Sequence, residues 1–445
     1  MKKKLYIETY GCQMNFSDSE IVTSVMTDDR FDSIDDIRQA DVIFLNTCSI
    51  RDNAEQRVLN RLRELQNLRK KNPDLVIGVL GCMAERLKTS LLEEEQMGMR
   101  VDMVVGPDAY RDLPRLMMDV ENGQQAANII LSEEETYADI TPVKHTPGGV
   151  SAFISIMRGC ENFCSYCVVP YTRGKERSRD PESILGEASR LFEQGYREIT
   201  LLGQNVNSYH WKKDEGNEPV TFSRLLELTA LISPLLRVRF ATSHPKDMSD
   251  ELLRTIASHD NICTAIHLPV QSGSSAVLQR MNRKYTREDY MDRVAAIRKI
   301  IPGCAISTDV ITGFCGETEE EHQQTLSLMR EVGYDFAFMF KYSERPGTLA
   351  ARKYKDDVAE QVKSRRLEEI IALQQELSAQ SNQQDVGKVM EVLVEGTSRR
   401  SQCDVSGRNP GNKIVVFPDK GFKPGEYVMV RITRCTSATL IGEAV

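Results

Sequence analysis

Short apolar runs alternate with polar, amphipathic stretches over the first hundred residues of the chain. The runs contain consecutive Val, Ile, Leu and Phe residues, which is typical of strands buried on both faces of a parallel sheet. They lie at residues 5–7, 42–45, 75–80 and 101–105. A charged run over residues 53–71 has helical periodicity, and Ser17 with Glu20 has the spacing of a capping box. We therefore expect a doubly wound α/β domain over residues 1–120.

The pattern changes between residues 121 and 149, where Gly, Gln, Pro and consecutive Glu residues predict a linker. From residue 150 to about 380, an apolar strand followed by a helical pattern recurs six times. The strand cores are 153–156, 199–202, 238–241, 266–270, 305–311 and 336–340. Six such units predict a partial (β/α)6 barrel, with its chemistry where strands end and loops begin.

The pattern of apolar and polar residues changes again in the last part of the chain. A polar, helical stretch over residues 356–380 precedes short β-type runs that are separated by Gly and Pro. The runs are 389–394, 413–417, 427–433 and 439–441. We expect residues 381–445 to form a small antiparallel β-barrel.

Composition limits the class of protein. The chain has 445 residues, 40% of them hydrophobic and 27% charged, so we expect two or three globular domains. It has no stretch of 18 apolar residues and no signal-peptide pattern, which predicts a cytoplasmic protein without a membrane partner. Its 11 cysteines are odd in number and dispersed, which disfavours a disulfide scaffold. The net charge of −8 means that any attraction of RNA must come from local basic patches.

Three cysteines lie within eight residues, directly after the first predicted barrel strand. Cys160, Cys164 and Cys167 have the spacing C-x3-C-x2-C. A zinc site would need a fourth Cys or His nearby, and the local sequence offers none, whereas three thiolates can hold a 4Fe-4S cubane with one iron exposed. Zinc or inert thiols remain the alternatives.

This loop, following the first strand of a six-unit barrel, resembles that of the radical S-adenosylmethionine (SAM) superfamily. The resemblance implies that the open iron binds SAM, and that an electron from the reduced cluster cleaves it to a 5′-deoxyadenosyl radical. In such enzymes the cofactor supplies the chemistry, while the protein orients and shields it.

A second set of cysteines follows the N-terminal strands. Cys12, Cys48 and Cys82 are 36 and 34 residues apart, and each is placed directly after a predicted strand. Because the carboxyl ends of parallel strands meet at one edge of a sheet, three distant loops can present three thiolates to one centre. Three buried core cysteines are the alternative. We favour a second iron-sulfur cluster at this edge.

Two cysteine triads in this order of domains resemble the methylthiotransferase family over essentially the whole chain. The motifs that carry the resemblance are Tyr10-Gly11-Cys12-Gln13-Met14-Asn15, Asn46-Thr47-Cys48-Ser49-Ile50-Arg51 and Gly203-Gln204-Asn205-Val206-Asn207. They look most like the branch that modifies N6-isopentenyladenosine in tRNA. Residues 407–413 resemble part of a TRAM domain, an RNA-binding barrel of many tRNA-modifying enzymes.

The resemblance implies a specific reaction. A methylthio group is added to C2 of N6-isopentenyladenosine at position 37 of tRNA, with one SAM as methyl donor and another as radical source. It implies two 4Fe-4S clusters, with the N-terminal one holding the sulfur. The expected partners are a tRNA anticodon stem-loop bearing the isopentenylated adenosine and an electron donor of the flavodoxin or ferredoxin type. We expect a monomer.

Polar residues after the barrel strands are candidates for binding SAM. Each of them can instead cap a loop or form a turn. The candidates are Tyr166, Gln204, Asn205, Ser243, His244, Gln271, Ser272 and Asp309. The superfamily usually has a Gly-Gly-Glu-like element after the second strand, and here the sequence reads Leu202-Gly203-Gln204-Asn205, so the group that binds the SAM amino group stays open.

Basic residues beyond the cluster loop and in the last domain are candidates for binding RNA phosphate, although a charge run is ordinarily a solvated face. Residues 382–445 contain nine Lys or Arg against seven Asp or Glu, a weak local excess. The candidates are Arg173, Lys175, Arg177, Arg179, Arg408 and Lys413.

Two other functions fit the same motifs. The acceptor could be a threonylcarbamoyl-adenosine or the aspartate side chain of a ribosomal protein. A protein of another class, a noncatalytic iron-sulfur RNA-binding protein or sensor, would also contain cysteine sets but would form no 5′-deoxyadenosine from SAM.

Overall fold

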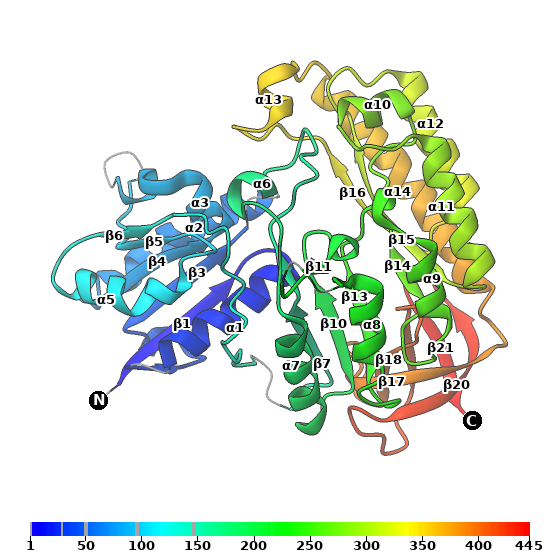
Figure 1. Cartoon of the computed structure of the whole chain (residues 1–445), viewed down its shortest axis with the longest axis horizontal. Coiled ribbons are helices and arrows are strands. Elements are labelled where there is room, and N and C mark those ends of the chain that lie inside the picture. Colours follow the sequence, from blue (N-terminus) through cyan, green and yellow to red (C-terminus); the bar gives the residue numbers. More distant parts are fainter. Residues whose placement is uncertain are drawn as a thin grey trace.

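The computed structural model describes residues 2–27, 30–48, 52–93, 98–144, 148–214, 216 and 218–445, without the side chains of 52–54 and 89. Figure 1 shows an N-terminal α/β domain beside a larger barrel domain, with a small all-β domain below the barrel. Residues Ser49–Arg51 of the second cysteine motif lie outside the described residues.

The N-terminal domain is a six-stranded parallel sheet in the order β2-β1-β3-β4-β5-β6. Apolar side chains of α1 and α5 pack on one face, and those of α2 and α3 pack on the other, so the doubly wound prediction is confirmed. The elements are β1 (Lys3–Thr9), α1 (Gln13–Thr27), β2 (Phe31–Ser33), η1 (Ile37–Gln39), β3 (Val42–Thr47), α2 (Asp52–Arg69), β4 (Val76–Gly81), α3 (Cys82–Leu87), η2 (Lys88–Leu92), β5 (Met103–Val105), η3 (Tyr110–Asp112), α5 (Leu113–Glu121) and β6 (Ala126–Asn128).

Three sequence predictions differ from this domain. The strand β6 lies inside the predicted linker 121–149, so the sheet continues past residue 120. The short strand β2 was also missed, because neither it nor β6 has more than three residues. Ser17 and Glu20 do not start a helix: α1 already begins at Gln13, directly after Cys12.

The six predicted barrel strands are all present. They form two parallel sheets, β7-β10-β13 and β14-β15-β16, which meet at a bridge between Val238 and Ile262, and helices cover the outside (Figure 1). The strands are β7 (Ser151–Ser155), β8 (Met157–Arg158), β9 (Arg177–Ser178), β10 (Glu198–Leu202), β11 (His210–Trp211), β12 (Val220–Thr221), β13 (Arg237–Ala241), β14 (Ala265–His267), β15 (Ala305–Thr312) and β16 (Phe336–Lys341). The helices are α6 (Val169–Thr172), α7 (Pro181–Glu193), η4 (Val206–Ser208), α8 (Phe222–Ala230), η5 (Pro245–Asp247), α9 (Asp250–Ala257), α10 (Ser275–Arg280), α11 (Arg287–Ile300), α12 (Glu319–Val332), α13 (Leu349–Lys353) and α14 (Glu360–Gln383).

The C-terminal domain is a closed five-stranded barrel in the order β17-β18-β19-β21-β20. Its strands are β17 (Val389–Thr397), β18 (Asp404–Arg408), β19 (Ile414–Pro418), β20 (Tyr427–Cys435) and β21 (Leu440–Ala444). The prediction of a wholly antiparallel barrel was wrong in one place, because β19 and β21 pair in parallel where the barrel closes. The sequence did not indicate β18, whose residues are mostly polar or Gly.

The small barrel is fixed to the amino-terminal ends of the large-barrel strands. Arg237 donates to the carbonyl of Arg408 at 2.7 Å, and Arg239 donates to that of Asn409 at 2.8 Å. The Tyr427 hydroxyl donates to the carbonyls of Arg197 and Leu235. These contacts leave the carboxyl ends of the strands, at the opposite side, free for the site.

Candidate active site

The three N-terminal cysteines meet at one edge of the sheet, as predicted. Cys12 follows β1, Cys48 follows β3 and Cys82 opens α3 directly after β4, and these three strands are neighbours in the sheet. The thiols of Cys12 and Cys48 are hydrogen-bonded. Cys12 is exposed, whereas the other two are buried. The group therefore has an open side at Cys12.

Two buried asparagines hold these loops together, and the sequence analysis did not identify their role. Asn15 accepts from the backbone N–H of Cys12 at 3.3 Å and donates to the carbonyl of Thr47 at 3.0 Å. Asn46 donates to the carbonyl of Asn15 at 2.9 Å. Each asparagine lies three or fewer residues from a cysteine, and this proximity was the only signal in the sequence.

Gly11 allows the loops to approach each other. Its backbone has φ +145°, and a Cβ at this position would overlap the Cβ of Cys48 and the side chain of Asn15. A side chain there would push the first and second cysteine loops apart. Glycine before Cys12 is therefore a requirement of the close packing of these loops.

An arginine from the barrel domain reaches the N-terminal thiols. Arg173 interacts with Cys82 and, more distantly, with Cys12. The hydrogen bond from Cys48 and the nearby guanidinium together lower the pKa of the Cys12 thiol to about 6, although the protein atoms around the sulfur partly desolvate it and act in the opposite direction. Burial raises the pKa of Cys82, and Arg173 only partly offsets it. The site thus favours thiolate at its open side, which is the form that binds metal.

The second cysteine set lies on a loop that is attached to the barrel mainly through its backbone. The N–H of Cys160 donates to the carbonyl of Gly174 at 3.2 Å, and that of Ser165 donates to the carbonyl of Met281 at 2.9 Å. Gly159 has φ +79°, and a Cβ there would overlap the backbone of Lys175. The loop geometry therefore depends on glycine at this position.

Arg283, which follows α10, also contacts this loop, and the sequence alone did not indicate it. Its buried guanidinium donates to the Cys164 sulfur at 3.2 Å and contacts the Tyr166 hydroxyl at 3.5 Å. Burial raises the pKa of the Cys160 thiol to about 11, and it also raises that of Cys167. Neutral thiols buried together gain stability when a cationic cluster binds their thiolates.

The donor sets fit iron-sulfur clusters better than single metal ions. All eleven cysteines are free thiols. Among the described residues, the only potential ligand atoms of three or more His, Cys, Asp or Glu within 4.8 Å of one another belong to Glu319, His322 and Glu369. Neither thiol triad is that compact, whereas the sulfurs around a tetrahedral zinc ion lie about 3.8 Å apart. Three thiolates without a fourth protein ligand suit a cubane with one open iron.

Unpartnered polar groups gather at the carboxyl ends of β10 and β13, where SAM-binding residues were predicted. No hydrogen bond in the structure satisfies the side-chain amide of Gln204, the Oδ1 of Asn205, the Oγ of Ser243 or the Nε2 of His244, and all of these atoms are buried. Buried polar atoms normally have partners, so their concentration beside the cluster loop indicates a polar ligand.

His244 is a hydrogen-bond donor in this group. Burial, together with Arg283 and Lys246, lowers the pKa of its imidazole to about 2, so the ring is neutral. Its Nδ1 accepts from the N–H of Lys246 at 3.3 Å, which assigns the proton to Nε2. That N–H has no partner in the protein and is free to donate to a ligand.

The other predicted SAM residues have different surroundings. Tyr166 lies beside the cluster loop, next to Arg283. Gln271 has φ +71° and joins β15 through its backbone, while the Ser272 hydroxyl contacts Thr325 and accepts from Ser274. Asp309 lies deeper in the barrel, three residues before the end of β15. Ser272 is therefore used in the protein itself, and Asp309 is separate from the unpartnered group.

The basic run after the cluster loop has another role than the predicted one. Arg173 pairs with Asp18 at 2.7 Å, and Arg177 pairs with Asp108 at 3.0 Å, and all four residues are buried. Arg158 is 1% exposed and pairs with Asp18 at 2.9 Å. These three arginines join the barrel to the N-terminal domain, so their guanidiniums face protein carboxylates and not solvent.

The remaining predicted RNA contacts are also paired within the protein. Arg179 is buried against Glu187, and Lys413 lies between Asp335 and Asp385. Arg408 pairs with Glu395, and Lys175 pairs with Glu133 at the surface. Lys175, with two thirds of its side chain exposed, is the most accessible of the six.

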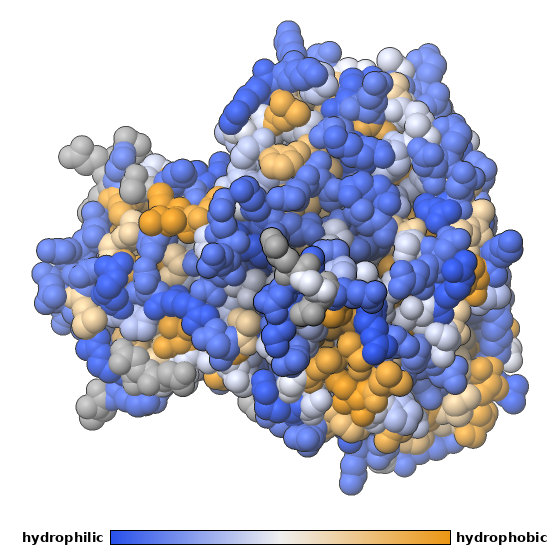
Figure 2. Space-filling model, in the orientation of Figure 1, coloured by the Kyte–Doolittle hydropathy of each residue, from blue (hydrophilic) through white to orange (hydrophobic). Residues whose placement is uncertain are grey.

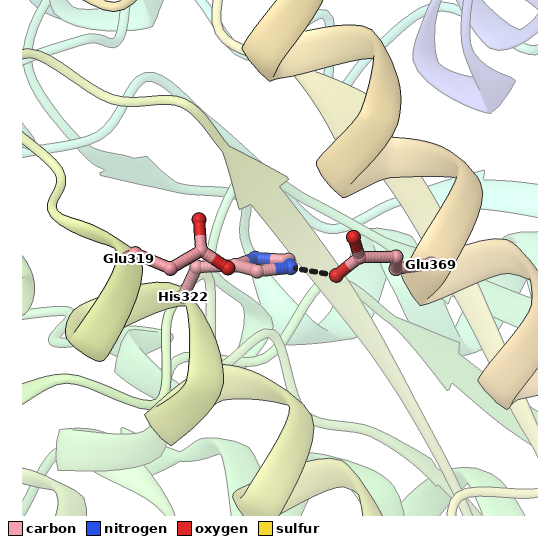
Figure 3. A group of neighbouring side chains, drawn as sticks. All are labelled: Glu319, His322 and Glu369. Carbon is pink, nitrogen blue, oxygen red and sulfur yellow. Dashed lines mark hydrogen bonds and ion pairs between the residues drawn. The ribbon is translucent and has the colours of Figure 1, made fainter.

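The compact group of Glu319, His322 and Glu369 is a structural contact between α12 and α14. Figure 3 shows the imidazole between the two carboxylates, with its Nε2 2.9 Å from Glu369. Arg365 pairs with both glutamates, and Arg366 pairs with Glu319. Two guanidiniums already neutralise the carboxylates, so this group does not attract a cation.

Comparisons with known proteins agree with the three domains. The family models Uncharacterized protein family UPF0004, Radical SAM superfamily and TRAM domain match residues 4–106, 154–329 and 383–445. A tRNA-2-methylthio-N(6)-dimethylallyladenosine synthase of Amoebophilus asiaticus is 59% identical over 99% of this chain and 92% of its own length. One from Bacteroides fragilis is 58% identical over 100% and 96%. The chain belongs to this synthase family.

Solved structures at low identity share the fold. The radical S-adenosylmethionine methyltransferase TsrM of Kitasatospora setae superposes with a TM-score of 0.55 at 14% identity, covering 79% of this chain and 75% of its own. The cobalamin-dependent SAM radical enzyme OxsB superposes with a TM-score of 0.53, covering 84% and 56%. These likenesses show the barrel fold, and the radical SAM family model matches residues 154–329 of that barrel. None of the described helices is both long and apolar enough to cross a bilayer.

Proposed function

We propose that the protein replaces the C2 hydrogen of N6-dimethylallyladenosine in tRNA, next to the anticodon, with a methylthio group. Dimethylallyl is the same five-carbon group as the isopentenyl group named above. One observation carries the proposal. Each domain has a thiol triad at the carboxyl ends of its parallel strands, and a buried group of ion pairs joins the two domains there. Membership of the synthase family supports the choice of acceptor.

Each triad would hold one cluster. The barrel cluster would be bound by Cys160, Cys164 and Cys167. The auxiliary cluster would be bound by Cys12, Cys48 and Cys82. When bound, these groups would supply reductive cleavage of one SAM to a 5′-deoxyadenosyl radical, which takes the C2 hydrogen and becomes 5′-deoxyadenosine, and a sulfur that is methylated from a second SAM and bonded to C2. A low-potential protein of the flavodoxin or ferredoxin type would supply the electron.

The residues of the chain position these reactants. Gln204, Asn205, Ser243 and His244 would bind the polar parts of SAM, because their unpartnered atoms surround the space beside the barrel cluster. The neutral imidazole of His244 would donate from Nε2 and would not exchange a proton. Tyr166 and Arg283 keep the cluster loop against the barrel.

A second acceptor is not favoured by any contact, but one experiment decides among all of them. Anaerobically reconstituted protein is incubated with SAM, dithionite and an anticodon stem-loop RNA that carries N6-dimethylallyladenosine, and the nucleosides are analysed by mass spectrometry. We expect the 2-methylthio product and 5′-deoxyadenosine. Formation of 5′-deoxyadenosine without product on this RNA, but with product on threonylcarbamoyl-adenosine RNA, contradicts the proposed acceptor.

A further inference from the structure

The last barrel strand presents two phenylalanines to the interior of the barrel. Successive side chains of a strand point to opposite faces. Ala337 is buried, and Met339 on the same face of β16 packs against the core that contains Ile370 and Leu373 of α14, so Phe336 and Phe338 point away from this helix, into the barrel. Their exposures are 50% and 45%, although the alternate residue Ala337 is 1% exposed. The interior wall is therefore apolar and accessible here.

The two rings form a pre-arranged surface. They lie edge to face with centroids 4.9 Å apart, and His267 stands edge to face with Phe338 at 5.9 Å. Phe338 is also paired in register with Asp309 of β15, whose carboxylate is 3.5 Å from His267. An apolar surface thus lies directly beside a hydrogen-bond acceptor.

Small barrels of this kind normally fill their interior with packed side chains. Leaving two large aromatic rings half accessible forgoes about 1 kcal/mol or more of burial for each ring. Surfaces of this kind usually bind something apolar. The acceptor beside the rings further requires an occupant with a donor close to its apolar part.

We propose that Phe336 and Phe338 bind the dimethylallyl group of the substrate adenosine, with Asp309 accepting from its N6–H. This inference rests on the proposed function. Phe338 lies three residues before the end of β16, about 10 Å below the strand ends at a rise of roughly 3.3 Å per residue. In adenine, C2 and C6 flank N1 and their substituents diverge, so C2 held at the strand ends leaves the N6 tail free to extend toward the phenylalanines.

The test compares two anticodon stem-loop RNAs that differ only in the dimethylallyl group. In the double variant Phe336→Ala/Phe338→Ala, kcat/KM for the prenylated RNA should fall about 10- to 100-fold, because a pocket distinguishes substrates by the apolar groups that it encloses. The value for the unprenylated RNA should change less than about twofold. Phe338→Leu, which keeps apolar volume, should retain most of the preference.

A matched control removes an exposed apolar side chain elsewhere. Figure 2 shows an apolar area below the centre of a mostly hydrophilic face, over α8. Leu231, which is 63% exposed, directly follows this helix, and Leu231→Ala should leave the preference unchanged. Thermal denaturation of each variant reports folding, and anisotropy binding of the two RNAs gives a readout independent of catalysis.

The outcomes separate the two proposals. If the wild-type protein does not methylthiolate the prenylated RNA, the proposed function is wrong. If it does so, and the folded double variant keeps the wild-type ratio of kcat/KM and of affinity between the two RNAs, the assignment of the phenylalanines is overturned. If the double variant does not fold, Phe338→Trp is measured instead. Its larger ring would occupy the space proposed for the dimethylallyl group, so the preference for the prenylated RNA must fall. An unchanged ratio in this variant also overturns the assignment.

Discussion

The two thiol triads are assembled by opposite kinds of architecture. Cys160 to Cys167 occupy one short loop, whose shape is set by local backbone hydrogen bonds and one glycine. Cys12 to Cys82 come from three loops that only a folded sheet brings together, through Asn15 and Asn46. Closing a long chain segment costs more entropy than closing a short one. The auxiliary site therefore depends on global folding, and the barrel site depends mainly on its own loop.

The largest effect should come from removing the thiols. Cys160→Ala should abolish formation of 5′-deoxyadenosine, whereas Cys12→Ala should preserve it and abolish methylthiolation, because only the barrel triad lies beside the residues proposed to bind SAM. Each variant should retain about one cubane per chain, against about two for the wild type, by iron and sulfide analysis. Methylthio product from the Cys12 variant would falsify the assignment of the auxiliary site.

Breaking the buried junction should have the next largest effect. Asp18→Asn removes the carboxylate paired with Arg173 and one of the two paired with Arg158, and loss of one member of a buried ion pair costs about 3–5 kcal/mol. We expect this loss in the free energy of unfolding from urea denaturation. The matched control is Lys175→Ala, whose pair with Glu133 is exposed and screened by solvent, so the free energy of unfolding should hardly change. Equal effects of the two variants contradict the assigned role of the junction.

The same junction gives stability a pH dependence. Burial raises the pKa of Asp18, but Arg158 and Arg173 outweigh it, so that the pKa lies below its ordinary value. A carboxylate with a depressed pKa stabilises the fold above its unfolded pKa of about 3.9 and loses this contribution as the pH falls through the folded value. The difference in unfolding free energy between wild type and Asp18→Asn should therefore be constant near neutral pH and shrink in acid.

Changing the residues that hold each set of loops tests the difference between the two triads. Asn46→Ala removes buried hydrogen bonds and should cost about 1–3 kcal/mol. It should release iron from the auxiliary site first, while 5′-deoxyadenosine formation persists. Asn282→Ala, which removes one hydrogen bond to the carbonyl of Phe163 in the barrel loop, is the counterpart and should leave both clusters in place. Iron retention during dialysis against a chelator distinguishes these results.

The smallest effect concerns SAM binding. His244→Ala should raise KM for SAM about tenfold through loss of one hydrogen bond. Because burial lowers the pKa of His244 to about 2, the ring stays neutral, and wild-type KM should show no transition due to it between pH 6 and 8. A wild-type transition near pH 6.5 that disappears in the variant would contradict a neutral donor.

Apolar runs were sufficient to predict the six barrel strands and the main strands of the N-terminal sheet. The strands β2, β6 and β18 were missed, because three-residue or polar strands depend on their neighbours for pairing. The cysteines were grouped correctly at the strand ends, since parallel strands end at one edge. The basic run 173–179 was misinterpreted, because its partners Asp18 and Asp108 are distant in the sequence. Arg283 was missed for the same reason.

The buried junction also has a consequence for biosynthesis. The N-terminal sheet ends at residue 128, but the arginines that pair with Asp18 and Asp108 are residues 158, 173 and 177. A nascent chain therefore completes this sheet on the ribosome about 30 to 50 residues before the charges of its two carboxylates are compensated, which at typical elongation rates is a delay of seconds. During that interval the cysteine edge of the sheet lacks Arg173, which reaches the thiols only when the cluster loop of the barrel has itself been translated.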